Sequence, residues 1–121
     1  MLKVGIAGTF ATSLDGAIRR NLTTPCDIII SNEARIIPRL ADIDVLVAMV
    51  LTHEVGAACG RLRLVQVPGA GLDRIDRSAM PSGTWLANVY GHETGIAEYV
   101  MGAILALTRD FVRLDAALRK G

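Results

Sequence analysis

Five short apolar runs recur along the chain, at residues 2–8, 26–31, 44–50, 63–67 and 84–89. Most of them lack the strict polar alternation that marks a strand with one face in water. Continuous apolar runs of this length are typical of strands that are buried on both faces of a parallel sheet. The runs therefore predict about five parallel strands.

Helix-capping residues occupy the segments between these runs. The candidate caps are Thr12 or Ser13, Asn32 and Thr52, and Pro38 is expected to disturb or divide the second helix. Strands that alternate with helices are joined by right-handed crossovers, which keep the strands parallel. The expected fold is thus an α/β, flavodoxin-like (Rossmann-like) doubly wound parallel sheet, followed by one long C-terminal helix.

That C-terminal helix is predicted to run from about residue 92 to residue 120, with Thr94 as its cap. Apolar residues recur there at spacings of three and four, which places them on one amphipathic stripe. Such a helix is about 40 Å long, whereas a body of this size is about 30 Å across. Its far apolar residues are therefore expected to need another surface, for example a second copy in a homodimer. These residues are Phe111, Leu114 and Leu118.

Composition limits the classes of partner. Lysine and arginine number 13 against 12 aspartate and glutamate, so the basic surplus that phosphate binding requires is missing and no nucleic-acid partner is expected. No apolar stretch is long enough to cross a bilayer, and no membrane is expected. Cys26 and Cys59 have no partner at metal-ligand spacing, which predicts reduced thiols in a cytoplasmic protein without a metal site.

A glycine-rich stretch, VQVPGAGLDRID at residues 65–76, follows the fourth predicted strand. It is not a dinucleotide fingerprint, because Arg74 stands where the third glycine of G-x-G-x-x-G is required. Ligands bind at the carboxyl ends of parallel strands, where successive N–H groups of a tight turn can hold an anion. Gly69, Ala70 and Gly71 are therefore candidate ligands of a carboxylate; the alternative is that they only turn the chain.

Two further loops reach the same edge of the predicted sheet, Thr9 to Ser13 and Val50 to Glu54. The first is rich in hydroxyl groups and could hold a phosphate. Trp85 or Tyr90 could stack on a flat ring, although a lone Trp in a strand is usually a core residue. These features define an alternative function, a free-standing flavodoxin-like binding module for a flavin or a phosphate.

The titratable side chains give no catalytic candidate. Asp73 and Asp76 lie three residues apart, but Asp73 is expected to cap the short turn that follows it. A general base needs a positioning partner, and the sequence reveals none for His53 or His92. Both histidines are expected to be solvated.

The order of residues resembles a known family. PGAGLDRID, then Ala79, Gly83 and Asn88, and then GIAEYVMGAILALTR at residues 95–109 are similar to the D-isomer-specific 2-hydroxyacid dehydrogenases. That family reads roughly G-x-G-x-D-x-I-D, then N, then V-A-E and a helix ending in Arg. The resemblance covers residues 63–121 well and the whole chain loosely.

The resemblance implies a substrate domain at residues 1–90 and an interdomain helix at residues 91–121 that leads to an NAD-binding domain, which this chain lacks. It implies an oxidoreductase that moves a hydride between the nicotinamide of NAD or NADP and a small 2-hydroxy or 2-keto acid. The backbone amides of Gly69 and Ala70 would bind the substrate carboxylate, and Thr94 would lie near the nicotinamide.

The family's catalytic arginine, glutamate and histidine belong to the nucleotide domain, so the resemblance does not place those roles on Arg109, Glu98 or His92. The chain is expected to be a truncated portion that binds no cofactor and is inactive alone. Pro68 stands where many relatives have a small or polar residue, and residues 49–51 bring no charge to the crevice. The substrate is therefore left open.

Overall fold

The computed structural model describes residues 1–121, apart from the side chain of Glu33. Contacts within the chain divide it into two compact units, Met1–Val89 and Tyr90–Gly121. The first unit contains the sheet with its helices, and the second contains two further helices.

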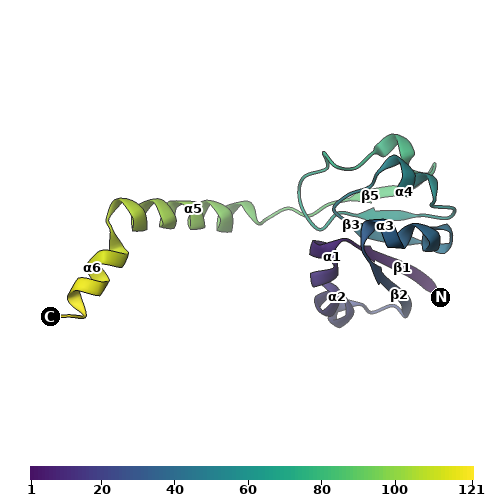
Figure 1. Cartoon of the computed structure of the whole chain (residues 1–121). Helices are drawn as coiled ribbons and strands as arrows, with labels where there is room; N and C mark the ends of the chain where they lie inside the picture. Colours follow the sequence, from purple (N-terminus) through teal and green to yellow (C-terminus); the bar gives the residue numbers. More distant parts are fainter. The chain divides into compact units, whose positions relative to one another are not determined.

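The first unit is built on a five-stranded sheet in which every pairing is parallel (Figure 1). The strands are β1 (Leu2–Ala7), β2 (Cys26–Ser31), β3 (Val45–Ala48), β4 (Leu64–Gln66) and β5 (Trp85–Ala87). Their spatial order is β2-β1-β3-β4-β5, the flavodoxin-like order, in which the winding reverses between β1 and β3. The predicted fold class is confirmed.

Short helices connect the strands. They are α1 (Thr9–Ser13), α2 (Asp15–Asn21), α3 (Glu33–Ile36), α4 (His53–Ala57) and the 3₁₀ helices η1 (Ile37–Asp42) and η2 (Arg77–Ala79). Successive side chains of a strand point to opposite faces of the sheet, so two separate cores form. One core joins β3 and β4 to α3, η1 and α4, with Leu46, Val65, Ile36, Leu40 and Val55 among its members. The other joins β1 and β3 to α1 and α2, with Val4, Ile6, Val47, Ala11 and Ile18.

Two of the predicted caps are confirmed. Asn32 Oδ1 accepts a hydrogen bond from Arg35 N at 2.8 Å, and Thr52 Oγ1 accepts one from Val55 N at 3.3 Å. Pro38 divides its segment as expected, because α3 ends at Ile36 and Pro38 lies in the first turn of η1. A proline N is tolerated there, since the first N–H groups of a helix have no partner within the helix.

The prediction that Thr12 or Ser13 begins the first helix is wrong. The chain turns from β1 into α1 at Gly8, whose φ of 89° lies in the region that favours glycine. Neither hydroxyl caps α1, and Ser13 Oγ instead donates to Phe10 O at 2.7 Å. The segment Thr9 to Ser13 is therefore a short helix and not an open loop.

Asp44 ties the amino ends of three strands together. It is only 3% exposed, and its carboxylate accepts hydrogen bonds from Lys3 N at 2.9 Å and from Arg61 Nη2 at 2.9 Å. Its backbone N donates to Lys3 O, and its carbonyl accepts from Arg63 N and Leu64 N. The hydrogen bond from the Lys3 backbone, with a smaller contribution from Arg61, holds the pKa of Asp44 below its usual value despite burial.

The second unit consists of α5 (Glu93–Thr108) and α6 (Phe111–Leu118). The predicted long C-terminal helix is present as α5, but its uninterrupted continuation to residue 120 is wrong. Asp110 separates the two helices with a left-handed φ of 53°. Aspartate is one of the few residues that tolerate this conformation, and here its carboxylate forms an ion pair with Arg113 of the following turn.

Within the second unit no side chain of either helix is buried. Tyr99, Val100 and Met101 follow one another in α5 and are 78%, 47% and 57% exposed. Consecutive helical residues are about 100° apart, so α5 is apolar on more sides than the single predicted stripe. A helix that is apolar on most sides is normally buried, and within the second unit nothing buries the apolar side chains of α5.

Candidate functional site

The carboxyl ends of β1, β3 and β4 meet at one edge of the sheet, next to the reversal of winding between β1 and β3. The segments that follow β3 and β4 are joined there by an isolated parallel bridge between Leu51 and Ile75. Leu51 N donates to Arg74 O at 3.0 Å, and Leu51 O accepts from Asp76 N at 2.8 Å. This edge of the sheet is thus held by backbone hydrogen bonds and not by flexible loops alone.

The glycine loop, Pro68 to Gly71, follows β4 at this edge. Its carbonyl groups are engaged, because Gly69 O accepts from Val89 N at 3.1 Å and Ala70 O accepts from Asn88 Nδ2 at 2.9 Å. Among the residues that the structure describes, no acceptor is found for the N–H groups of Gly69, Ala70 and Gly71. The loop is therefore fixed through its acceptors, and its donors remain available for an anion.

Neither glycine of the loop has a positive φ, and the groups nearest to an added Cβ are the ends of flexible side chains. A Cβ on Gly69 would lie 3.2 Å from Met49 Cε, and one on Gly71 would lie 2.9 Å from Asp73 Oδ1. Gly69 thus allows the Met49 side chain, which follows β3, to lie against the loop. Asn88 is a residue whose role sequence reasoning missed, although its position in the family pattern was the available signal.

The assignment of the cap that follows the loop is corrected. Asp76, and not Asp73, caps η2: its Oδ1 accepts from Ser78 N at 3.0 Å and from Ser78 Oγ at 2.6 Å. The Ser78 hydroxyl is the largest cause of a lowered pKa at Asp76, and the Ser78 N–H and His53 act in the same direction. His53 Nδ1 lies 3.7 Å from Asp76 Oδ2 and is 80% exposed.

The loop does not fit a dinucleotide. After Arg74 the chain enters the bridge at Ile75 and then η2, which has three residues, so no long helix begins where a pyrophosphate would need one.

In the described chain no group of three His, Cys, Asp or Glu side chains is placed to hold a metal ion. None of the described helices is long and apolar enough to span a membrane.

A hollow of about 300 Å³ lies at the same edge, over the β1/β3 reversal. Its lining residues are Ala7, Gly8, Thr9, Phe10, Ala11, Met49, Val50 and Arg74. Sequence reasoning treated Arg74 only as the residue that breaks the dinucleotide fingerprint. Its position in the hollow depends on the Leu51–Ile75 bridge, and no sequence pattern predicts this bridge.

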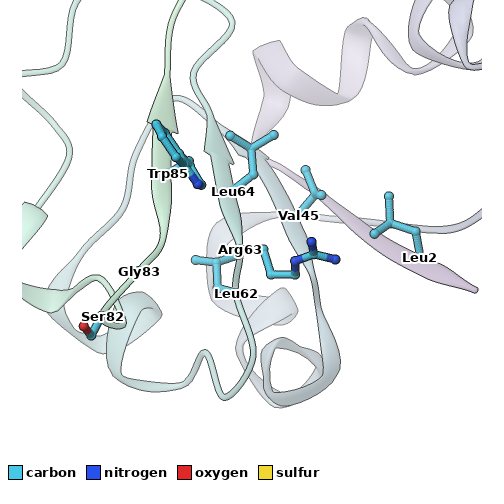
Figure 2. A pocket seen from close by; sticks show the side chains of 8 residues that line it. All are labelled: Leu2, Val45, Leu62, Arg63, Leu64, Ser82, Gly83 and Trp85. Carbon is cyan, nitrogen blue, oxygen red and sulfur yellow. The ribbon is translucent and has the colours of Figure 1, made fainter.

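A larger hollow, of about 540 Å³, lies at the opposite ends of the strands (Figure 2). Val45, Leu64 and Trp85 are register neighbours that begin β3, β4 and β5, and their side chains stand side by side in this view. The smaller hollow is the better site candidate, because ligands of doubly wound sheets bind at the carboxyl ends.

Trp85 corrects the expectation of a core residue, since it is 77% exposed on the edge strand. It begins β5, whereas Thr9 to Ser13 follow the carboxyl end of β1. A flavin with its ring on Trp85 and its phosphate on Thr9 to Ser13 would have to connect opposite ends of the sheet. This arrangement does not favour Trp85 as the ring-stacking residue of a flavin module.

Thr94 lies in the first turn of α5 and is not its cap. The helix begins after His92, and the Glu93 carboxylate accepts a hydrogen bond from Gly91 N at 2.8 Å. The Glu93 backbone N–H and the Gly91 N–H both lower the pKa of Glu93. No side chain caps the first N–H groups of α5, so the predicted threonine cap is wrong.

Comparison with solved structures places this fold among known proteins. The whole chain superimposes on a 2-hydroxyacid dehydrogenase from Ketogulonicigenium vulgare Y25 (TM-score 0.74, 19% identity, 41% of that chain) and on the pyruvate reductase of Chlamydomonas reinhardtii (0.69, 20%, 39%). A protein from Pyrococcus horikoshii OT3 matches likewise (0.64, 22%, 38%). No family model and no curated protein matches the sequence.

These likenesses establish a fold that is also found in two oxidoreductases, a 2-hydroxyacid dehydrogenase and a pyruvate reductase. The chain spans about two fifths of the length of the three solved proteins.

Proposed function

We propose that this chain is the substrate-binding portion of an NAD(P)-dependent D-2-hydroxyacid dehydrogenase, and that its glycine loop holds the carboxylate of a small 2-hydroxy or 2-keto acid. One observation carries the proposal: Gly69, Ala70 and Gly71 present N–H groups without a protein acceptor at the ligand-binding edge. The residue pattern in the second half of the chain and the likeness to two oxidoreductases support it.

In this proposal the chain binds and orients the acid. Main-chain donors suit this task, because a fixed loop positions the carboxylate without the entropy cost of ordering long side chains. The nucleotide would be held outside this chain, since the glycine loop does not fit a dinucleotide. The second unit would lead toward that nucleotide domain, which would supply the apolar surface that α5 requires and would lie near Thr94.

The carboxylate site is tested by reversing charge at the loop. Ala70→Glu is expected to weaken the binding of D-lactate by about tenfold, because two carboxylates a few ångströms apart repel each other. Ala70→Gln has nearly the same shape without the charge, and its binding should stay within about threefold of the wild type. Amide chemical shifts of the ¹⁵N-labelled chain measure both affinities.

In the wild type, saturating D-lactate is expected to move the amide signals of Gly69, Ala70 and Gly71 more than that of Gly16, which lies in α2. If the loop signals stay still, or if Ala70→Glu binds as tightly as Ala70→Gln, the carboxylate site is wrong.

The chain is also expected to bind the acid without converting it. We expect the purified 121-residue chain to leave NADH absorbance unchanged in the presence of pyruvate, because its glycine loop does not fit a dinucleotide. Turnover above a protein-free blank would contradict this division of roles.

A further inference from the structure

Arg74 is held in place by the tertiary structure and yet has no partner. Its backbone carbonyl accepts from Leu51 N at 3.0 Å, beside the Leu51–Ile75 bridge, and both bridge residues are buried. No ion pair or hydrogen bond of its guanidinium is found with any group that the structure describes. By contrast, the guanidinium groups of Arg61 and Arg113 pair with Asp44 and Asp110.

The surroundings of Arg74 suit a small anion. Of the eight residues around the 300 Å³ hollow, Arg74 is the one that carries charge, and none is acidic. Gly8 lines the hollow at the point where β1 turns into α1, and its φ of 89° keeps a side chain out of this position. A guanidinium offers paired N–H donors in a plane that matches a carboxylate.

Met49 lies between the hollow and the glycine loop. The Met49 side chain lines the hollow and also lies where a Cβ on Gly69 would contact it. The order of groups along the edge is therefore main-chain donors, a flexible apolar side chain, and a cation. A ligand with an anionic group at each end and a short carbon chain between them matches this order.

We propose that the substrate is a 2-hydroxy acid with two anionic groups, such as a dicarboxylate. Its first carboxylate is held by the glycine loop, and Arg74 binds its second anionic group. The inference rests on the proposed function and narrows its substrate class. Arg74 acts here as a specificity residue: it selects dianionic over monoanionic acids, while Met49 packs against the carbons between the two ends.

The test compares two acids of equal carbon number, D-malate and D-2-hydroxybutyrate, by ¹⁵N chemical-shift titration of the full chain. D-malate is expected to bind about three- to tenfold more tightly, a modest gain because Arg74 is exposed to water. The gain should shrink when NaCl is raised from about 20 mM to about 200 mM, because salt screens an exposed pair.

Arg74→Met should abolish the preference for D-malate and leave the affinity for D-2-hydroxybutyrate unchanged. Arg74→Lys should keep part of the preference. Arg77→Met is the matched control, because Arg77 is an exposed arginine three residues away that does not line the hollow. Its preference for D-malate should equal that of the wild type. Amide spectra of each variant show that the fold is retained.

The outcomes separate the two proposals. Equal affinity for the two acids, or a preference that survives Arg74→Met, overturns the role of Arg74 while leaving the glycine loop intact. The carboxylate site at the glycine loop is wrong instead if D-malate moves the signals of Gly8 to Phe10, but not those of the loop amides, and if this effect requires Arg74. If neither acid moves any signal at this edge, both proposals are wrong.

Discussion

Gly56→Ala is expected to destabilise the sheet unit by about 1–3 kcal/mol and to lower its thermal midpoint by roughly 5–20 °C. Gly56 is buried in α4, and an added Cβ would meet the backbone and side chain of Ala79, with Ala79 Cβ only 2.6 Å away. Ala79 belongs to η2, so α4 and η2 would have to separate. Thermal unfolding followed by circular dichroism measures the effect.

The control for this prediction is Gly16→Ala in the exposed helix α2. A Cβ there would meet only the tip of Arg20 at 3.4 Å, which is ordinary contact. Alanine is the better helix former by about 0.5–1 kcal/mol, so this variant should be slightly more stable than the wild type. Equal midpoints for the two variants would show that the close approach of α4 and η2 is not a constraint.

Among substitutions that remove a single charge, Asp44→Asn is expected to lower the stability of the fold most. The amide keeps the shape of the side chain, but it removes the negative charge that Arg61 neutralises and one of the two oxygens that accept hydrogen bonds. Both partners lie at the amino ends of the strands, so the loss loosens the junction of β1, β3 and β4. Urea unfolding at neutral pH should show a lower midpoint for the variant.

The pH dependence of this effect follows from the lowered pKa of Asp44. A carboxyl group with a lower pKa in the folded state stabilises the fold above its unfolded pKa of about 3.9, and this contribution disappears as pH falls through the folded pKa. The difference in stability between wild type and Asp44→Asn should therefore be constant from about pH 7 to pH 5 and shrink below about pH 4.

Asp42→Asn provides the comparison. Asp42 is 69% exposed and pairs only with the Lys3 ammonium at 3.1 Å, and exposed pairs contribute little. A midpoint for Asp44→Asn that is no lower than that of Asp42→Asn would refute the role of the buried carboxylate.

The strands and two of the helix caps were predictable because their causes are local. Apolar runs mark the strands, and Asn32 and Thr52 cap the helices that immediately follow them, whatever the rest of the chain does. The same local reasoning placed Pro38 correctly, since a proline restricts its own turn. It failed at Asp110, where a left-handed residue divides a segment whose apolar spacing continues without interruption.

The candidate site was predictable only in part. The glycines at positions 69 and 71 predicted a backbone anion site, and the structure adds that a Cβ at either position would contact the side chain of Met49 or Asp73. Asn88 contacts Ala70, which is 18 positions away in the sequence. Arg74 contacts Leu51, which is 23 positions away. Contacts over such separations depend on how the strands assemble.

The sequence by itself determined that this chain forms a parallel α/β sheet with a glycine loop at its carboxyl edge, because hydrophobic runs, caps and turn residues act over a few neighbours. The tertiary structure decided which groups of that loop are free. Hydrogen bonds from Val89 and Asn88 occupy the loop carbonyls and leave the N–H groups without a protein acceptor. It also decided that an arginine lines a hollow at the same edge, because the pairing of Leu51 with Ile75 brings Arg74 there.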